Sequence, residues 1–347
     1  MNHQIERIIQ LSNAFGPSGH EHAVQEIAIR ECSDICSPYT DTLKNTFLPL
    51  NNGNKHTLLL DAHADEVGFI IQTIQKNGSL RFLPLGGWDP KNIISCPVQI
   101  LTKKGFIKGI VASRPVHFLS EAEKNKPVDF SDLVIDVATS SKAETEALGI
   151  RIGDFVVPDV TCTYDAQRKI LTGKAFDCRI GCAALIETLH RLKDETLHHN
   201  ILGLLSSQEE VGDRGMACAV RTMQPMAAIC FEGCPADDTF EEECMIQSAM
   251  KKGPMLRYFD RSMITHPEWM AYALKVADEE NIPYQVSVRK GGGTNGGILH
   301  VHDIPTIVIG IPVRFAHASV GYCSYEDYEH AVAFAVKIVQ HIGVDYK

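Results

Sequence analysis

Five segments of this sequence place carboxylates or histidines where metal-assisted chemistry would need them. In chain order they are His63 and Asp65 after TLLLDA, Asp177 at the end of GKAFD, Glu209 and Glu210 after ILGLLSSQ, Glu232 after AAICF, and His317 after TIVIGIPVRFA. Four of these segments follow apolar runs that we interpret as strands. Because functional groups gather beyond the carboxyl ends of strands in open α/β sheets, we expect these side chains to lie close together.

Such a concentration of carboxylates without lysine would be strongly destabilising unless cations neutralise it. Divalent metal ions do so, since a carboxylate can bridge two ions and a neutral histidine supplies a nitrogen ligand. Each residue alone has an ordinary explanation: His63 as a surface or core-capping residue, Glu232 as a loop carboxylate, and Asp177 as a helix N-cap. The pair of glutamates alone is typical of a charged strand end. The joint pattern favours a metal site.

The elements that must position these residues alternate between helices and strands. We predict helices over 4–12, 20–32, 179–193, 214–222, 266–279 and 325–341, and strands ending near Asp61 and over 200–206, 227–232, 284–288 and 305–311. Thr265 with Glu268, and Ser324, are the expected caps of the last two helices. The strands are continuous apolar runs, which is typical of a largely parallel sheet with helices on both sides.

Between these parts the character of the sequence changes. Short alternating runs at 98–101, 107–112 and 133–137 indicate strands, and Asn77-Gly78 and Lys104-Gly105 are hairpin signals. One helix is expected there, from Ser141 to Leu148. We therefore predict one α/β domain, residues 1–68 plus 164–347, interrupted by a β-rich insert at residues 69–163.

Composition excludes several classes of partner. The formal net charge of −10 is spread without a basic face, which argues against nucleic acid or an anionic membrane as a partner. No apolar stretch reaches the length of a membrane span, and MNHQIERIIQ lacks the features of a secretory signal. The eleven cysteines are scattered without a CxxC pair, so we expect reduced thiols in a cytoplasmic protein.

The sequence resembles the TET, or glutamyl (deblocking), aminopeptidases, which are co-catalytic two-metal exopeptidases. The resemblance covers essentially the whole chain. It is carried by GPSGHE (16–21), AHADEVGF (62–69), RIGDFVV (151–157), GKAFDCRIG (173–181), SSQEEVGDRG (206–215) and IPVRFAH (311–317). The AHxDE and QEExG motifs, in this order and with these separations, are highly specific.

The resemblance implies a role for each candidate residue. Asp177 would bridge two divalent ions, with His63 and Glu232 completing one site and Glu210 and His317 the other. Asp65 would orient the His63 imidazole, and Glu209 would remain unbound as the general base. The ions implied are zinc or cobalt, with manganese as an alternative.

The resemblance also implies an overall architecture and assembly. The catalytic domain would have the phosphorylase/peptidase-like fold, and the insert would be a barrel-like or PDZ-like dimerisation domain. Dimers would assemble into a hollow tetrahedral dodecamer. Nothing in the composition or periodicity bears on that assembly.

Four positions depart from the family pattern. Glu232 stands where aspartate is usual, and Cys178 replaces the usual aspartate or asparagine after the bridging residue. Asn295 and Gly321 stand where aspartate and glutamate are common, and we expect both positions to face the substrate. The segment KGGGTNGG (290–297) lacks the GK[ST] ending of a phosphate loop, so we expect a flexible loop beside the site.

The expected function is hydrolysis of N-terminal residues from short peptides. One alternative keeps the metals but acts as an N-deacylase or carboxypeptidase, which would need an arginine facing them to hold a substrate carboxylate. Arg179, Arg289 and Arg314 are candidates for that arginine. A second alternative is an interaction or scaffold protein that has lost its metals, and the complete ligand set argues against it.

Overall fold

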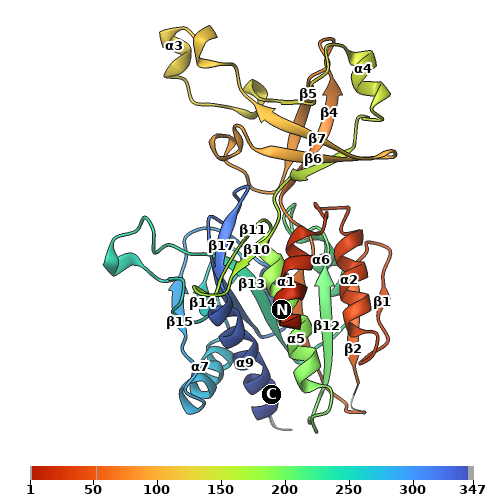
Figure 1. Ribbon diagram of the computed structural model, residues 1–347. Helices are drawn as coiled ribbons and strands as arrows, with labels where there is room; N and C mark the ends of the chain where they lie inside the picture. Colours follow the sequence, from red (N-terminus) through yellow and green to blue (C-terminus); the bar gives the residue numbers. More distant parts are fainter. Residues whose placement is uncertain (1, 52, 343–347) are drawn as a thin grey trace.

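The computed structural model describes residues 2–51 and 53–342. Figure 1 shows an α/β body that contains both ends of the described chain, with a smaller β-rich part above it. The chain leaves the body after β3 (Thr57–His63) and returns at β10 (Thr163–Asp165). The two parts therefore follow the predicted order of one domain interrupted by another.

A mixed sheet of eleven strands, counted over the described residues, forms the centre of the body. Its order is β1-β2-β12-β3-β13-β16-β17-β11-β10, and β14 pairs with both β15 and β16. The remaining strands are β1 (Tyr39–Thr40), β2 (Thr46–Leu50), β11 (Ile170–Gly173), β12 (Asn200–Ser206), β13 (Ala227–Pro235), β14 (Met255–Phe259), β15 (Gln285–Val288), β16 (Thr306–Arg314) and β17 (Gly321–Ser324). The four neighbours β12, β3, β13 and β16 run parallel, whereas the strands flanking them pair antiparallel. The predicted parallel strands are thus found at the centre of the sheet.

Alternating side chains of the central strands build two apolar layers. In β3, Leu58 and Leu60 join one core cluster while Leu59 joins another on the opposite face. The first cluster is covered by α1 (His3–Asn13), α2 (His22–Cys32), α5 (Phe176–Leu192), α7 (Pro267–Glu279) and α9 (Tyr325–His341). The second is covered by α6 (Arg214–Ala219) and α8 (Asn295–Val301). Burial on both faces explains why these strands are continuous apolar runs.

The helix caps agree with the sequence in one case and differ in another. The Ser324 hydroxyl accepts from the Asp327 N–H at the start of α9, as predicted. The predicted cap Thr265 is wrong, because its hydroxyl donates to the Arg257 carbonyl and α7 begins after His266. The predicted loop at 290–297 is also only partly correct. The Thr294 hydroxyl caps α8, so the second half of that segment is helical.

The insert is a closed six-stranded barrel in the order β4-β5-β8-β7-β6-β9. The strands are β4 (Gly68–Ile74), β5 (Leu80–Leu85), β6 (Pro97–Thr102), β7 (Gly105–Ala112), β8 (Val134–Asp136) and β9 (Phe155–Pro158), accompanied by α3 (Glu121–Lys124) and α4 (Lys142–Ala147). Short 3₁₀ turns cover Pro90–Ile93, Val116–Phe118 and Phe130–Asp132, and a fourth, Glu243–Met245, lies in the body. Both predicted hairpins form, with Gly78 and Gly105 at positive φ.

Two sequence expectations concern the whole chain. Among the described residues, no helix is long and apolar enough to cross a membrane. All eleven cysteines are unpaired, and most are buried, as expected for small core side chains.

Candidate metal centre

The register of the central strands brings the predicted residues to one edge of the sheet. Ser206, the last residue of β12, lies opposite His63 at the end of β3. Cys230 of β13 lies opposite Asp61, so Glu232 falls at the level of His63. Glu209 and Glu210 follow β12 in a turn, His317 follows β16, and Asp177 lies in the first turn of α5. All seven predicted site residues therefore come from this edge.

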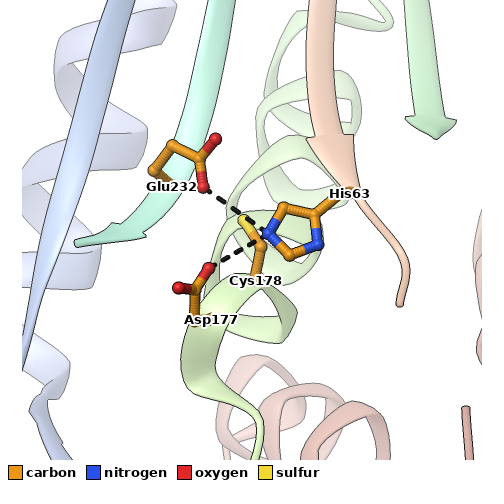
Figure 2. Close-up of side chains that lie close together, drawn as sticks. All are labelled: His63, Asp177, Cys178 and Glu232. Atoms are coloured by element: carbon orange, nitrogen blue, oxygen red, sulfur yellow. Dashed lines mark hydrogen bonds and ion pairs between the residues drawn. The ribbon is translucent and has the colours of Figure 1, made fainter. Parts of the chain in front are cut away.

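His63 forms the buried half of the cluster (Figure 2). Its Nε2 atom lies 3.0 Å from Asp177 Oδ1 and 3.6 Å from Glu232 Oε2. The Cys178 thiol belongs to the same group, since one donor atom from each of these four residues lies within 4.8 Å of the others. The His63 side chain is only 2% exposed.

His317 forms the second half of the cluster. Its Nε2 atom lies 3.2 Å from Asp177 Oδ2 and 3.3 Å from Glu210 Oε1. Asp177 thus directs one oxygen toward each histidine. That arrangement suits a carboxylate shared between two cations.

Asp65 organises more of the cluster than the His63 ring. Its Oδ1 atom lies 3.3 Å from His63 Nδ1, and its carboxylate accepts from the Ser18 hydroxyl at 2.6 Å. The same carboxylate accepts from the backbone N–H of Glu209 at 3.0 Å and of Glu210 at 3.1 Å. One side chain therefore fixes both the imidazole and the turn that carries the two glutamates.

The adjacent glutamates form their ion pairs with different histidines, although both lie near His63. Glu209 Oε2 lies 3.9 Å from His63 Nε2, whereas Glu210 contacts His317. They lie beyond the end of β12, where the backbone N–H groups of Gly212 and Asp213 both donate to the Glu209 carbonyl. Glu209 is thus near the cluster but farther from the histidine than either Asp177 or Glu232.

The outer histidine is held by the insert. His317 Nδ1 lies 2.7 Å from the carbonyl oxygen of Gly87, and its side chain is 35% exposed. The next residue, Trp88, is anchored in the barrel, because its ring stacks on Phe69 and its Nε1 donates to the Gly68 carbonyl. Nothing in the spacing of the sequence signals this contact between residues 230 positions apart.

Without cations the cluster needs protons to balance its charge. Burial opposes ionisation of the two histidines, but Glu209 and its neighbours raise the pKa of His63 well above its usual value. In the same way Glu210 and Asp177 outweigh burial and raise the pKa of His317 to about 12. Burial raises the pKa of Glu232 to about 8 and that of Glu209 well above its usual range. Divalent cations would supply the same balance with the carboxylates ionised.

The donor set fits such cations. The cluster offers imidazole nitrogens and carboxylate oxygens, which are the usual ligands of zinc and related ions. Besides the His63 group, Asp177, Glu210 and His317 form a second set of donor atoms within 4.8 Å of one another. A third set joins His63 with Glu209 and Glu210, so each of the two glutamates also has a carboxylate oxygen within that distance of His63.

The cluster lies in a cavity of about 980 Å³. Arg257, Arg289 and the glycines at 291–293 line the cavity together with the cluster. Arg257 is almost fully buried and pairs with Asp260 at 2.8 Å, a contact that sequence reasoning missed. The volume is sufficient for a short peptide segment or a comparable small ligand.

The three candidate arginines have different environments. Arg179 is fully buried and donates to the carbonyls of Leu11, Ala14, Gly16 and Ala64 and to Glu66, so it cannot hold a substrate carboxylate. Arg314 pairs with Asp238 and does not line the cavity. Arg289 lines the cavity but pairs with Asp237 at 3.3 Å.

Two further buried carboxylates were missed from the sequence. Glu66 pairs with Lys174 at 2.6 Å and with Arg179 at 3.2 Å, which ties the segment after His63 to the segment before Asp177. Glu21, in GPSGHE, accepts from the backbone N–H of Gln208, the residue before Glu209. Both act on the positions of the cluster residues rather than on a ligand.

Two expectations about substrate-facing positions are wrong. Asn295 is buried beneath the site, where its amide donates to Asp61 and Ser206. Gly321 is buried at the start of β17, and a Cβ atom there would lie 2.6 Å from the Arg314 carbonyl oxygen. A glutamate at position 321 would therefore require a backbone shift.

The α/β fold, with imidazole and carboxylate donors gathered at one edge of its sheet, defines the class of protein as a hydrolase with a candidate metal site. The chain belongs to the M42 glutamyl aminopeptidase family, whose model matches residues 45–334. It is 31% identical over 329 residues to the putative aminopeptidase FrvX of Escherichia coli K12, covering 94% of this chain and 92% of that protein. Aminopeptidase activity follows from membership of this family.

Solved structures agree with the family assignment. The TET aminopeptidase of Thaumarchaeota archaeon SCGC AB-539-E09 is 33% identical, with a TM-score of 0.96 over 99% of this chain and 98% of that one. The Pyrococcus horikoshii TET1 peptidase, which can assemble into a tetrahedron or a large octahedral shell, is 27% identical. Its TM-score is 0.89, over 98% of this chain and 100% of that one. The predicted TET-like fold is confirmed.

Proposed function

We propose that this protein is a two-metal aminopeptidase that removes N-terminal residues from short peptides. The observation that carries the proposal is the position of Asp177, with one oxygen 3.0 Å from His63 and the other 3.2 Å from His317. A scaffold protein would gain nothing from burying such a set of charges. The proposed setting is the cytoplasm, where eleven unpaired cysteines would stay reduced.

In this proposal each half of the cluster holds one divalent ion. His63 and Glu232 would hold one, Glu210 and His317 the other, and Asp177 both. The ions, zinc or cobalt with manganese as an alternative, would polarise the scissile carbonyl and acidify the attacking water. Asp65 keeps the His63 ring and the backbone of both glutamates in position through its hydrogen bonds.

Glu209 is proposed as the general base. It borders the cavity beside the cluster, and its carboxylate is the one farther from the histidines. It would take a proton from the attacking water and pass it to the leaving amine.

Replacing Glu209 by glutamine tests that role. Turnover of peptide substrates should fall by about 100- to 10,000-fold, because a general base contributes that much. Metal content, measured by elemental analysis, should stay near that of the wild type. The control is Glu195→Gln, which removes an exposed carboxylate that does not line the cavity and should leave turnover unchanged. Near-normal turnover of metal-loaded Glu209→Gln would contradict the assignment.

A second candidate function rests on Arg289. This arginine lines the cavity, and its Nε atom is buried without a hydrogen-bond partner among the described residues, so it could meet a substrate carboxylate. A panel of aminoacyl-p-nitroanilides and N-blocked peptides, assayed with zinc, cobalt and manganese, separates the functions. Aminopeptidase action requires cleavage of free N-termini. Cleavage of blocked peptides alone would favour a deacylase.

Self-association is proposed for the insert. The proposed boundaries are residues 1–68 plus 164–347 for the catalytic domain and 69–163 for a dimerisation domain. Phe106, Ile110, Val116 and Phe118 are exposed on the insert, and the related Pyrococcus horikoshii peptidase assembles into a tetrahedron. We infer dimers that form a tetrahedral dodecamer. Light scattering after gel filtration should give the mass of twelve chains, and a monomer mass would contradict the inference.

A further inference from the structure

We propose that the sulfur of Cys178 is an additional ligand of the metal ion in the buried half of the cluster, beside His63 and Glu232. This inference rests on the proposed two-metal function. It concerns a side chain that departs from the family pattern, in which aspartate or asparagine is usual. The ligand class it selects is a soft, thiophilic divalent cation.

The geometry supports this role. Cys178 Sγ lies within 4.8 Å of donor atoms of His63, Asp177 and Glu232, and Figure 2 shows the sulfur amid these atoms. The Cys178 side chain is fully buried, as is almost all of His63 and Glu232. An ion in contact with His63 and Glu232 would therefore lie beside the sulfur, on the side of the cluster away from the open cavity that His63 and Glu232 also line.

The local backbone holds the sulfur in this position. Cys178 lies in the first turn of α5 but has non-helical angles, φ −113° and ψ 34°, so its side chain does not follow the helix surface. Gly181 provides the space, because a Cβ atom at that position would lie 2.4 Å from Cys178 Sγ. A larger residue at 181 would push the sulfur away from His63.

In the ion-free protein the thiol has a weaker partner. Cys178 Sγ lies 3.2 Å from the carbonyl oxygen of Phe231, to which it donates. To hold an ion as a thiolate, the sulfur would release its proton to solvent and give up its hydrogen bond to the Phe231 carbonyl.

A sulfur ligand would make the two halves chemically different. The buried half would offer nitrogen, oxygen and sulfur, whereas Asp177, Glu210 and His317 offer only nitrogen and oxygen. Thiolate ligands favour zinc and other soft ions over manganese and magnesium. The buried half should therefore reject manganese more strongly than the outer half does.

Cys182 provides a matched control. It lies one turn further along α5, is also fully buried, and donates to a backbone carbonyl of the site, that of His63 at 3.1 Å. It belongs to none of the donor groups found among the described residues. Cys182→Ser therefore repeats the loss of a buried thiol beside the cluster without removing the proposed ligand.

The test is X-ray absorption spectroscopy of the full chain loaded with zinc. Wild type and Cys182→Ser should show a sulfur scatterer at about 2.3 Å, and Cys178→Ser should show only nitrogen and oxygen at about 2.0–2.2 Å. Absence of sulfur from zinc-loaded wild type, or its persistence in Cys178→Ser, would overturn the proposal. Cys178→Asn, the residue usual in the family, serves if the serine variant does not fold.

Two further measurements sharpen the result. Competition between cadmium and manganese should shift by about 10- to 100-fold toward manganese in Cys178→Asn, the scale on which groups around a metal act. An unchanged preference would count against a sulfur ligand. Peptidase activity of the zinc-loaded wild type is measured in parallel. Activity without a sulfur signal overturns only the role of Cys178, and a sulfur signal without activity overturns only the proposed function.

Discussion

The two halves of the cluster share Asp177 but are supported in different ways. The His63 half lies at the ends of β3 and β13 and the start of α5, all within the α/β body. The His317 half lies on a loop after β16, and its histidine is held by Gly87 of the barrel insert. The difference is also one of exposure, since the His63 side chain is 2% exposed and that of His317 is 35%.

One site therefore combines a histidine fixed within the α/β body, His63, with a histidine whose position depends on a second domain, His317. The buried half is fixed by sheet register and by Asp65, whose position depends on the same strand. Asp65 also holds the backbone N–H of Glu210, but the histidine of the outer half depends on where the insert places Gly87. We therefore expect the two halves to respond differently to substitution, pH and changes in the insert.

The largest difference is expected from removing each histidine. His63→Gln should weaken binding of the inner ion by at least about 100-fold and lower the melting temperature, because it removes the imidazole beside buried Glu232 and beside one oxygen of Asp177. His317→Gln should weaken binding of the outer ion but lower the melting temperature less, because the His317 side chain is 35% exposed and water can partly replace it beside Asp177 and Glu210. Metal titration and calorimetry measure both effects, with exposed His300→Gln as the control. Equal losses of stability would contradict the expected difference between the two halves of the cluster.

A smaller change in melting temperature is expected when the pH is varied in the presence of a chelator. The folded-state pKa of Glu232 is raised from 4.5 to about 8, so folding favours its protonated form. Its contribution to stability is fully present below about pH 4.5 and is lost as the pH rises through about 8. The raised pKa of His317 acts in the same direction. The chelated protein should thus melt at a lower temperature near pH 8 than near pH 6.

Two controls show whether that pH effect comes from the cluster. Zinc should remove it, because metal binding favours the deprotonated ligands and strengthens as the pH rises. Glu232→Gln should flatten the pH dependence of the chelated protein. A chelated wild type that becomes more stable between these pH values would contradict the assignment of these charges.

The smallest effect is expected from the insert. Trp88→Phe keeps an aromatic ring on Phe69 but removes the hydrogen bond to the Gly68 carbonyl. The loop that carries Gly87 should loosen, and the outer ion should bind a few-fold more weakly, since one hydrogen bond contributes about 1 kcal/mol. Isothermal titration with zinc measures this. An equal weakening of the inner ion would show that Gly87 does not act on His317 selectively.

The sequence predicted that these side chains lie close together, because their positions are tied to local patterns. His63, Glu209, Glu210 and Glu232 follow or end buried strands, and parallel neighbours carry such residues to one edge. The central strands and the barrel hairpins were predictable for the same reason. Strands and hairpins are recognised from hydrophobic periodicity and turn residues, which are patterns of only a few neighbouring positions.

The environments of other residues near the site could not be predicted, because they depend on packing between segments that are distant in the sequence. Arg179 is part of a motif near Asp177, yet its guanidinium is enclosed by backbone carbonyls of α1 and the loop after it. Asn295 follows a glycine-rich run typical of a loop, but it begins a helix whose first amide reaches Asp61. No spacing in the sequence encodes which residue lies across a packed interface. Arg179 was therefore a candidate for binding a substrate carboxylate, and Asn295 was wrongly expected to face the substrate.

The hydrogen bond between the Gly87 carbonyl and His317 couples the position of the barrel to the position of the outer histidine. A hydrogen bond tolerates only a few tenths of an ångström before it weakens, so a small tilt of the barrel would move the imidazole or release it. The exposed apolar side chains of the insert and this hydrogen bond belong to the same barrel domain. If assembly tilts the barrel, the affinity for the outer ion should change more than the affinity for the inner one.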